Sequence, residues 1–168
     1  MNKEKSTEEI VKNDYQEHLN KNTKKIGLAS DHRGYDLKQK LTNYLNEKGY
    51  NVIDYGCNDK NKHDYPKYAF KLGEAIRDKK VEKGIAICGS GIGISIACNK
   101  VKKVRCAKVN TKEEAKYTRL DNDANIIALN GDMELYKAQD IVDTFLNTPF
   151  SNEERHIKRI KMVDDYKC

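Results

Sequence analysis

The sequence has no tryptophan, only two prolines and no long apolar run. None of its hydrophobic stretches approaches the roughly 18 residues that a membrane-spanning helix needs, so we expect no membrane association. Its five cysteines include no C-x-x-C pair and none of the common zinc spacings, which argues against a metal site. The odd number of cysteines and the polar first segment, which lacks an apolar signal core, favour reduced thiols and a cytoplasmic location.

The positive charge of the chain lacks the organisation of a nucleic-acid-binding surface. The formal net charge is +6, but the basic residues are scattered and no ladder of aromatic residues accompanies them. Residues 1–24 hold five lysines and five acidic residues, so the excess lies in the rest of the chain. We therefore expect a small anionic ligand and no nucleic acid.

A chain of 168 residues predicts one domain, here preceded by a short appendage. Ser6-x-x-Glu9 has the pattern of a capping box, and apolar residues follow it at four-residue spacing. This pattern predicts a short helix within 7–20. We treat 1–23 as an N-terminal appendage and 24–168 as the domain.

From residue 25 onwards, short apolar runs alternate with segments of helical period. The runs predict strands at 26–29, 51–55, 85–87, 104–109 and 125–129. The segments between them predict helices at 36–48, 65–79, 94–100, 112–120, 133–146 and 153–166. This alternation predicts an α/β fold, a three-layer α/β/α sandwich around a five-stranded, parallel, Rossmann-like sheet. Ligands of such sheets bind outside the carboxyl ends of the strands.

The segment 84–100 carries the most informative motif. Its strand ends in Cys88, and three glycines follow at alternate positions, Gly89, Gly91 and Gly93, before a helical stretch. Free backbone N–H groups at such a turn bind anions. A thiol placed beside them can act as a base or a nucleophile.

Two familiar phosphate-binding patterns fit this loop poorly. The last glycine of a G-x-G-x-x-G dinucleotide fingerprint would fall where Ile94 stands, and no acidic residue closes the next strand. A cysteine phosphatase loop would need arginine at the same position. From this segment alone, a purely structural glycine turn stays open.

Two further groups of polar residues are candidates, each with a simpler alternative. Asp31 and His32 follow the first strand, where they could cap a helix or meet a phosphate. Arg155 and Arg159 lie one helical turn apart, with His156 beside them. Arginine suits phosphate because its planar fork bonds two oxygens, although a solvated basic face has the same pattern.

Together these stretches resemble the ribose-5-phosphate isomerase B / galactose-6-phosphate isomerase family of phosphosugar isomerases. The resemblance runs from about residue 25 to residue 166. It rests on five stretches in order: Ala29-Ser-Asp-His-Arg-Gly34, Asp64-Tyr-Pro66, Ile87-Cys-Gly-Ser-Gly-Ile-Gly-Ile-Ser-Ile-Ala97 followed by Asn99-Lys100, Asn122-Asp-Ala-Asn125, and Arg155-His-Ile-Lys-Arg159. It implies an enzyme without metal or cofactor, a homodimer or tetramer whose active sites lie between two subunits.

The resemblance implies interconversion of an aldose phosphate and a ketose phosphate through a cis-enediolate. Ribose 5-phosphate and ribulose 5-phosphate, of the pentose phosphate pathway, are the leading pair. Cys88 would be the base, and Ser90 would contact the sugar and assist ring opening. The N–H groups of 89–93 would hold the enediolate oxygens.

The resemblance also assigns the remaining substrate contacts. Sugar binding would fall to Asp31, Tyr65 and Asn122, the last supplied by the partner subunit. The phosphate ligands would be His32, Arg155, His156 and Arg159.

Two positions depart from the family pattern. Asp121 stands where the family usually has a histidine that opens the furanose ring, so it is the candidate for that step. Asp132 stands where the family commonly has a phosphate-binding arginine. Two alternatives therefore stay open: an isomerase of another phosphosugar, such as galactose 6-phosphate, allose 6-phosphate or a tetrose phosphate, and a non-catalytic sugar-phosphate-binding homologue.

Overall fold

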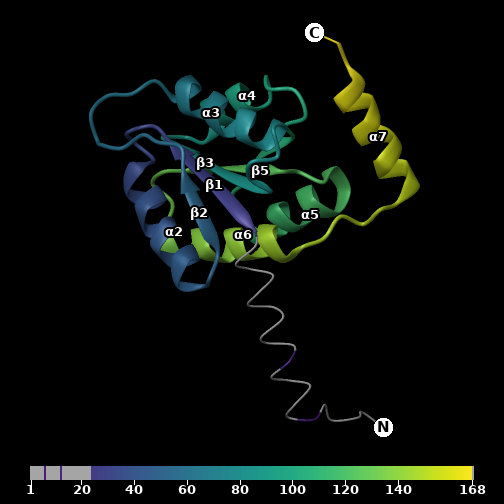
Figure 1. Cartoon of the computed structure of the whole chain (residues 1–168), viewed down its shortest axis with the longest axis horizontal. Helices are drawn as coiled ribbons and strands as arrows, with labels where there is room; N and C mark the ends of the chain where they lie inside the picture. Colours follow the sequence, from purple (N-terminus) through teal and green to yellow (C-terminus); the bar gives the residue numbers. More distant parts are fainter. Residues whose placement is uncertain (1–5, 7–11, 13–23, 168) are drawn as a thin grey trace.

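The computed structural model describes residues 6, 12 and 24–167, and it contains one sheet covered by helices on both faces (Figure 1). Five parallel strands pair in the order β2-β1-β3-β5-β4. The strands are β1 (Lys25–Ser30), β2 (Asn51–Asp54), β3 (Lys83–Cys88), β4 (Cys106–Lys108) and β5 (Ile126–Asn130). The helices are α2 (Tyr35–Glu47), α3 (Tyr65–Arg77), α4 (Ile92–Cys98), α5 (Lys112–Asn122), α6 (Leu135–Asn147) and α7 (Glu154–Asp165).

The predicted three-layer sandwich is confirmed, with differences at the ends of elements. Helix α4 begins at Ile92, two residues before the predicted start at 94, because the left-handed Gly91 ends the loop there. Strand β4 has three residues in place of the predicted six, because it lies at the edge of the sheet and pairs on one side with β5. The helix predicted within 7–20 falls outside the described residues, apart from residue 12.

The two faces of the sheet bury side chains of different size. Ile85 and Ile87 of β3 pack towards α2, α5 and α6, whereas Ala86 and Cys88 pack towards α3 and α4. Small residues on the second face let α3 approach closely, and a Cβ added at Gly27 would lie 2.6 Å from a methyl group of Leu72. Since side chains alternate along a strand, this pattern puts Cys88 on the face that α4 covers.

A buried lysine holds the loop after β2 close to the end of β1. The Lys38 ammonium of α2 is fully buried, and it donates to both carboxylate oxygens of Asp54 at 2.6 Å and to the carbonyl of Cys57 at 2.7 Å. The Ser30 amide donates to the Gly56 carbonyl at 2.7 Å, and the Cys57 amide donates to the Ser30 carbonyl at 2.8 Å. The loop after β2 is therefore tied to the strand end that precedes Asp31.

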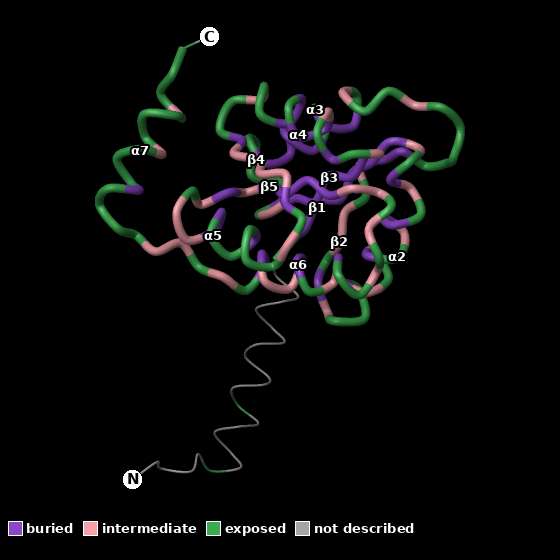
Figure 2. Tube along the Cα trace, turned by 180° about the vertical axis from the view of Figure 1, so that it is seen from behind, coloured by how far each residue is buried: buried purple, intermediate pink, exposed green. Residues whose placement is uncertain are grey.

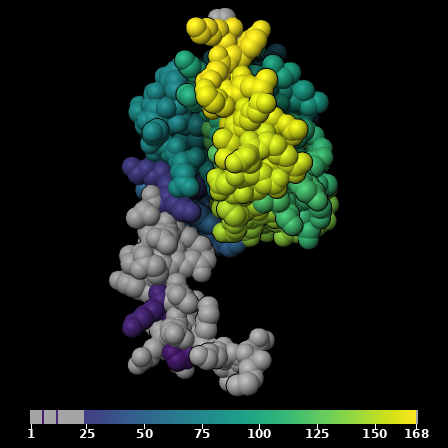
Figure 3. Space-filling model, turned by 90° about the vertical axis from the view of Figure 1, so that its right-hand side faces the viewer, coloured from purple at the N-terminus to yellow at the C-terminus, as the bar shows by residue number. Residues whose placement is uncertain are grey.

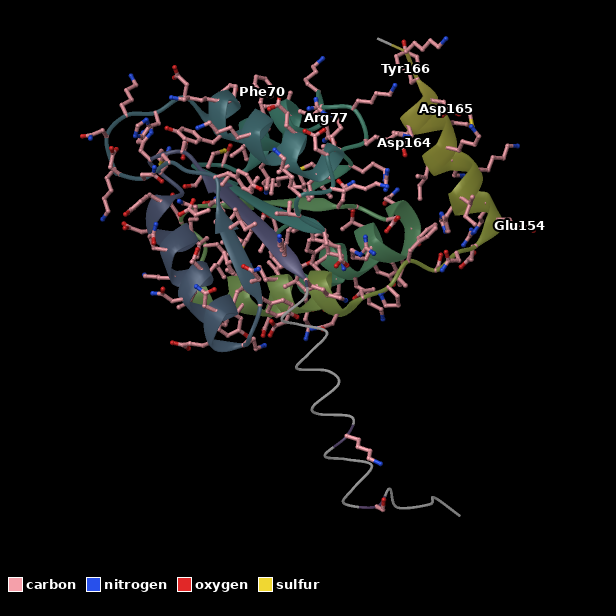
Figure 4. The ribbon with its side chains drawn as sticks, viewed as in Figure 1. Phe70, Arg77, Glu154, Asp164, Asp165 and Tyr166 are labelled. Atoms are coloured by element: carbon pink, nitrogen blue, oxygen red, sulfur yellow. The ribbon has the colours of Figure 1, made fainter. Side chains whose placement is uncertain are left out.

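Helix α7 projects from the body, and Figure 2 shows it almost wholly exposed. In Figure 3 this C-terminal segment, in yellow, covers much of the flank that faces the viewer. The Arg105 guanidinium reaches Asp164 of α7 at 2.9 Å, and Figure 4 shows Asp164 on the side of the helix that faces the body. His156 is the one buried residue of α7. Several of its large apolar side chains are exposed, namely Ile157, Met162 and Val163, with Tyr166 just beyond the helix.

No helix in the described part of the chain has both the length and the apolar character that crossing a membrane requires.

A half-buried lysine at the beginning of β3 makes the free energy of unfolding depend on pH in the alkaline range. Burial, followed by the positive charge of Arg119, lowers the pKa of Lys83 from 10.5 to about 8. Between these two values the unfolded chain binds more protons than the folded chain, so the contribution of Lys83 to stability rises with pH. Below pH 8 both states are protonated, and the burial of the charge is fully unfavourable.

We expect Lys83→Met to gain stability relative to the wild type at pH 7 and to lose that advantage by pH 10. The change should be on the order of 1 kcal/mol, allowing for the partial exposure of the ammonium. Urea unfolding at several pH values measures it. The control is Lys80→Met, an exposed lysine of the same turn, whose difference from the wild type should stay constant. A pH-independent difference for Lys83→Met would contradict the prediction.

Candidate active site

The carboxyl ends of β1 and β3 form the topological switch point of the sheet. The two strands are neighbours, but β2 lies beyond β1 and β5 lies beyond β3, so the connections diverge and leave a crevice between them. The amide of Asp31 donates to the carbonyl of Ile87 at 3.1 Å, which holds the two strand ends together. A shallow cleft of about 330 Å³ opens here, lined by Asp31, Arg33, Tyr65, Cys88, Gly89, Ser90, Gly93 and Asn130.

The thiol of Cys88 lies at the bottom of this cleft and is 4% exposed. Its sulfur accepts a hydrogen bond from the Gly91 amide at 3.2 Å, and its carbonyl accepts one from the Gly131 amide at 2.9 Å. Gly91 has φ 76°, and a Cβ there would lie 2.9 Å from the carbonyl carbon of Leu129. The loop after Cys88 is therefore held in one conformation, with an N–H group directed at the sulfur.

The other two glycines of the loop make room for side chains of the cleft. A Cβ at Gly93 would lie 2.8 Å from Cζ of Tyr65, and a Cβ at Gly89 would lie 2.8 Å from Nη1 of Arg33. The Ser90 hydroxyl accepts a hydrogen bond from the Ile92 amide at 3.1 Å, which orients it at the start of α4. Larger residues at 89 or 93 would displace the groups that line the cleft.

Asp31 holds the turn that precedes α2 and also lines the cleft. Its Oδ1 accepts hydrogen bonds from the amides of Arg33 at 2.9 Å and Gly34 at 3.0 Å, which lie before the helix. The N-cap of α2 is Gly34, without a side-chain cap, so the expected capping role of Asp31 is replaced by a turn. Within the described part of the chain nothing donates to Oδ2. One carboxylate oxygen thus fixes the turn while the other stays available to a hydroxyl group.

His32 is oriented by the loop that follows β2. Nδ1 of His32 lies 3.1 Å from the amide nitrogen of His63 and 3.2 Å from its carbonyl oxygen, so it accepts a hydrogen bond in one tautomer and donates one in the other. The His63 ring is held in turn by Asp59 at 2.6 Å and by the Tyr68 hydroxyl at 3.1 Å. The hydrogen bond from His63 is the first cause that lowers the pKa of Asp59. These contacts orient the His32 ring, but His32 is not one of the residues that line the cleft.

The other predicted site residues do not reach this cleft within one chain. Asp121 and Asn122 end α5 at the edge where the strands begin, a strand length of roughly 13 Å from the Cys88 edge. On α7, His156 is buried with Nε2 3.4 Å from Oδ1 of Asp121. Arg155 pairs with Glu153 of its own segment, and Arg159 is exposed on α7. In Figure 1, α7 stands at the right while β1 ends at the upper left.

The described cysteines other than Cys88 lie outside the cleft. Burial raises the pKa of Cys57, and a hydrogen bond with Cys98, followed by burial, raises that of Cys106. Both effects favour the protonated thiol, which fits a packing role. No cluster of His, Cys, Asp and Glu side chains within the described residues could hold a metal ion.

Two larger pockets lie elsewhere, and both are lined by basic and acidic side chains. One of about 530 Å³ lies at the opposite edge of the sheet, beside Lys25, Lys83 and Arg105. The other, of about 980 Å³, lies between 99–104 and the end of α7. Neither is lined by a cysteine or a histidine. We therefore choose the smaller cleft as the candidate active site because it contains a thiol, although its volume is lower.

Comparison with known proteins identifies the family of this chain. The sequence model of the Ribose/Galactose Isomerase family matches residues 26–163. The chain belongs to this family. The ribose-5-phosphate isomerase B of Clostridium thermocellum has a similar structure, with a TM-score of 0.82 and 42% identity over 84% of this chain and 95% of that one.

Two relatives in this isomerase family show how far the similarity extends. YwlF of Bacillus subtilis, named only as an expected sugar phosphate isomerase, is 39% identical over 84% of this chain and 96% of its own length. Ribose-5-phosphate isomerase B of Escherichia coli is 36% identical over 83% of this chain and 94% of its own length. The chain is thus a member of a sugar phosphate isomerase family.

Arg33 and Asn130 line the cleft of this family member, and the sequence motifs did not select them as site residues. Asn130 ends β5 directly opposite Cys88 in the sheet register, so the strand order would have indicated it. Arg33 carried a weaker signal, as a basic residue between Asp31 and Gly34, where a Cβ would lie 2.5 Å from the Ile87 carbonyl oxygen.

Proposed function

We propose that this protein is an aldose–ketose isomerase of phosphorylated sugars, with ribose 5-phosphate and ribulose 5-phosphate as the leading pair. The observation that carries the proposal is the Cys88 sulfur in the strand-end cleft, with the Gly91 amide 3.2 Å away. A base beside backbone donors is what an enediolate mechanism requires, because negative charge develops on oxygen as the proton leaves carbon.

The proton moves between two neighbouring carbons of the open-chain sugar. Cys88 removes the proton from C2 of the aldose, the electrons of that bond form the C1–C2 double bond, and the carbonyl electrons move to O1. The N–H groups of 89–93 stabilise the resulting oxyanion. Return of the proton to C1, with transfer of the O2 proton to O1, gives the ketose and removes the negative charge. Asp31 and Tyr65 orient the sugar, and Ser90 contacts it during ring opening.

We also propose that two subunits of a homodimer share each site. The residues assigned to the phosphate, to ring opening and to the sugar lie away from the Cys88 cleft of the same chain: Arg155, His156 and Arg159, then Asp121, then Asn122. A second copy related by a twofold axis could bring them to it. The exposed apolar side chains of α7 support this, because a partner would bury them.

Asp121 and Asp132 favour one alternative substrate class. Where the family has a ring-opening histidine and a phosphate-binding arginine, this chain has two carboxylates, and a carboxylate repels phosphate. A different phosphosugar, such as galactose 6-phosphate, allose 6-phosphate or a tetrose phosphate, is therefore the second candidate. The intact Cys88 loop argues against the non-catalytic homologue.

A panel of phosphosugars in D₂O tests the function. We expect ribose 5-phosphate to give ribulose 5-phosphate with deuterium at C1, seen by NMR, because a thiol that exchanges with solvent carries the proton. The same panel contains the alternative phosphosugars and unphosphorylated ribose. Faster turnover of a hexose or tetrose phosphate would establish the second candidate. Turnover of none would contradict the proposal.

A further inference from the structure

The cleft contains one cation, and it comes from the loop after β1. Arg33 is the only positively charged residue among the eight that line the cleft, and Asp31 is the only negatively charged one. The Arg33 guanidinium lies over Gly89: a Cβ there would be 2.8 Å from Nη1 and 2.9 Å from Cζ. Cys88 lines the same cleft, so the cation and the thiol that we propose as the base face one ligand space.

The loop after β5 positions this guanidinium. Gly131 packs so closely that a Cβ there would lie 2.4 Å from the Arg33 carbonyl oxygen. The next residue, Asp132, accepts a hydrogen bond from Nη2 of Arg33 at 3.3 Å, and its own amide donates to the Asn130 side chain at 2.7 Å. Both side chains of the pair are largely exposed, at 59% and 73%. Such an ion pair is weak, so a substrate anion can replace the carboxylate.

We propose that Arg33 is a catalytic residue that stabilises the enediolate, and that Asp132 holds its guanidinium over the cleft until the substrate binds. This inference rests on the proposed isomerase function. A cis-enediolate carries two oxygens on the same side of its double bond, and the planar fork of arginine bonds two such oxygens at once. As Cys88 removes the C2 proton, negative charge moves to O1, and N–H groups of Arg33 donate to it. When the proton returns to C1, the charge disappears and the guanidinium returns to Asp132.

The kinetic test uses Arg33→Gln, Asp132→Asn and the double variant on the phosphosugar that the wild type turns over best. Removal of an oxyanion donor lowers kcat by about 10²–10³ at a buried site, so we expect about tenfold to a hundredfold at this more exposed one. KM should change by less than about threefold, because the charge develops only in the transition state. Asp132→Asn should raise kcat by up to about fivefold, the range of an exposed ion pair.

The double variant shows whether Asp132 acts through Arg33. In the Arg33→Gln background, the Asp132→Asn change should have no effect on kcat. An equal increase in both backgrounds would mean that Asp132 only repels the substrate, and it would overturn the pairing. The matched control is Arg77→Gln with Asp78→Asn, an exposed pair of the same chemistry at the end of α3, near the Arg77 label in Figure 4. Its kinetics should match the wild type.

A binding measurement separates this inference from the proposed function. Ribonate 5-phosphate carries a planar carboxylate where the enediolate oxygens would lie, and calorimetry measures its Kd. Arg33→Gln should weaken it by about tenfold, as loss of a charge-assisted bond does, and should leave the Kd of inorganic phosphate unchanged. If both ligands weaken equally, Arg33 binds phosphate and the inference is wrong. If only the aldonate weakens but the wild type isomerises no sugar, Arg33 binds a carboxylate without catalysis, and the proposed function fails together with the catalytic role. If the wild type isomerises a phosphosugar and Arg33→Gln weakens neither ligand, the proposed function stands and the inference alone is wrong.

Discussion

Cys88→Ala is expected to abolish isomerisation while substrate binding stays nearly intact. General-base catalysis contributes about 10²–10⁴ in rate, and no other thiol or imidazole among the described residues lines the cleft to replace this one. Turnover in the variant should therefore fall by about three orders of magnitude. The measurements are kcat on the phosphosugar and the Kd of ribonate 5-phosphate, which should change by less than about threefold because the thiol contributes little to binding.

Two controls make this prediction specific to the position. Cys106→Ala removes a half-buried thiol outside the cleft and should keep wild-type kcat. Alkylation with iodoacetamide should inactivate the wild type, and bound substrate should slow the reaction. Isomerisation by Cys88→Ala at near the wild-type rate would remove Cys88 from the mechanism, whatever the binding data show.

The sequence predicted the Cys88 half of the cleft because that half depends on local pattern. An apolar run ending in Cys88, a glycine loop and a following helix define a strand end whatever the rest of the chain does. Parallel strands put their carboxyl ends at one edge, so Asp31 and Cys88 could be expected together before any contact was known. In the structure β1 lies beside β3, and the Asp31 amide donates a hydrogen bond to the Ile87 carbonyl.

The parts that escaped prediction depend on contacts between distant loops. Arg33 and Asp132 are 99 residues apart, and they meet because Gly131 lets the two backbones touch. His63 contacts His32 through its backbone, and a backbone contact cannot be predicted from the pattern of side chains. The start of α4 at Ile92 follows from the left-handed Gly91, whose conformation reflects packing against Leu129. The spacing of apolar residues along the sequence does not indicate these contacts between distant loops.

The site residues on α5 and α7 were predicted from the family resemblance. Because they lie far from Cys88 of the same chain, a shared active site between two subunits can be tested. Cys88→Ala should be inactive because it lacks the base, and Arg159→Ala should be nearly inactive at low substrate concentration, because loss of a charge-assisted phosphate ligand raises its KM by about tenfold or more. If each site combines Cys88 of one subunit with Arg159 of its partner, a mixed dimer of the two variants contains one site with both residues intact. A site built within one chain contains none.

We therefore expect activity to return when the two inactive variants are unfolded together and refolded as a mixture. Random pairing makes half of the dimers mixed, each with one intact site of two, so recovery should approach about a quarter of wild-type activity. Each variant refolded alone is the control and should stay inactive or nearly inactive at the same low substrate concentration. Mixing Cys88→Ala with Cys88→Ser is the matched negative pair, because every site then lacks the base. Recovery in the first mixture alone would place Arg159 across the interface from Cys88, whereas no recovery, with mixed dimers shown by mass spectrometry, would confine both residues to one chain and overturn the shared site.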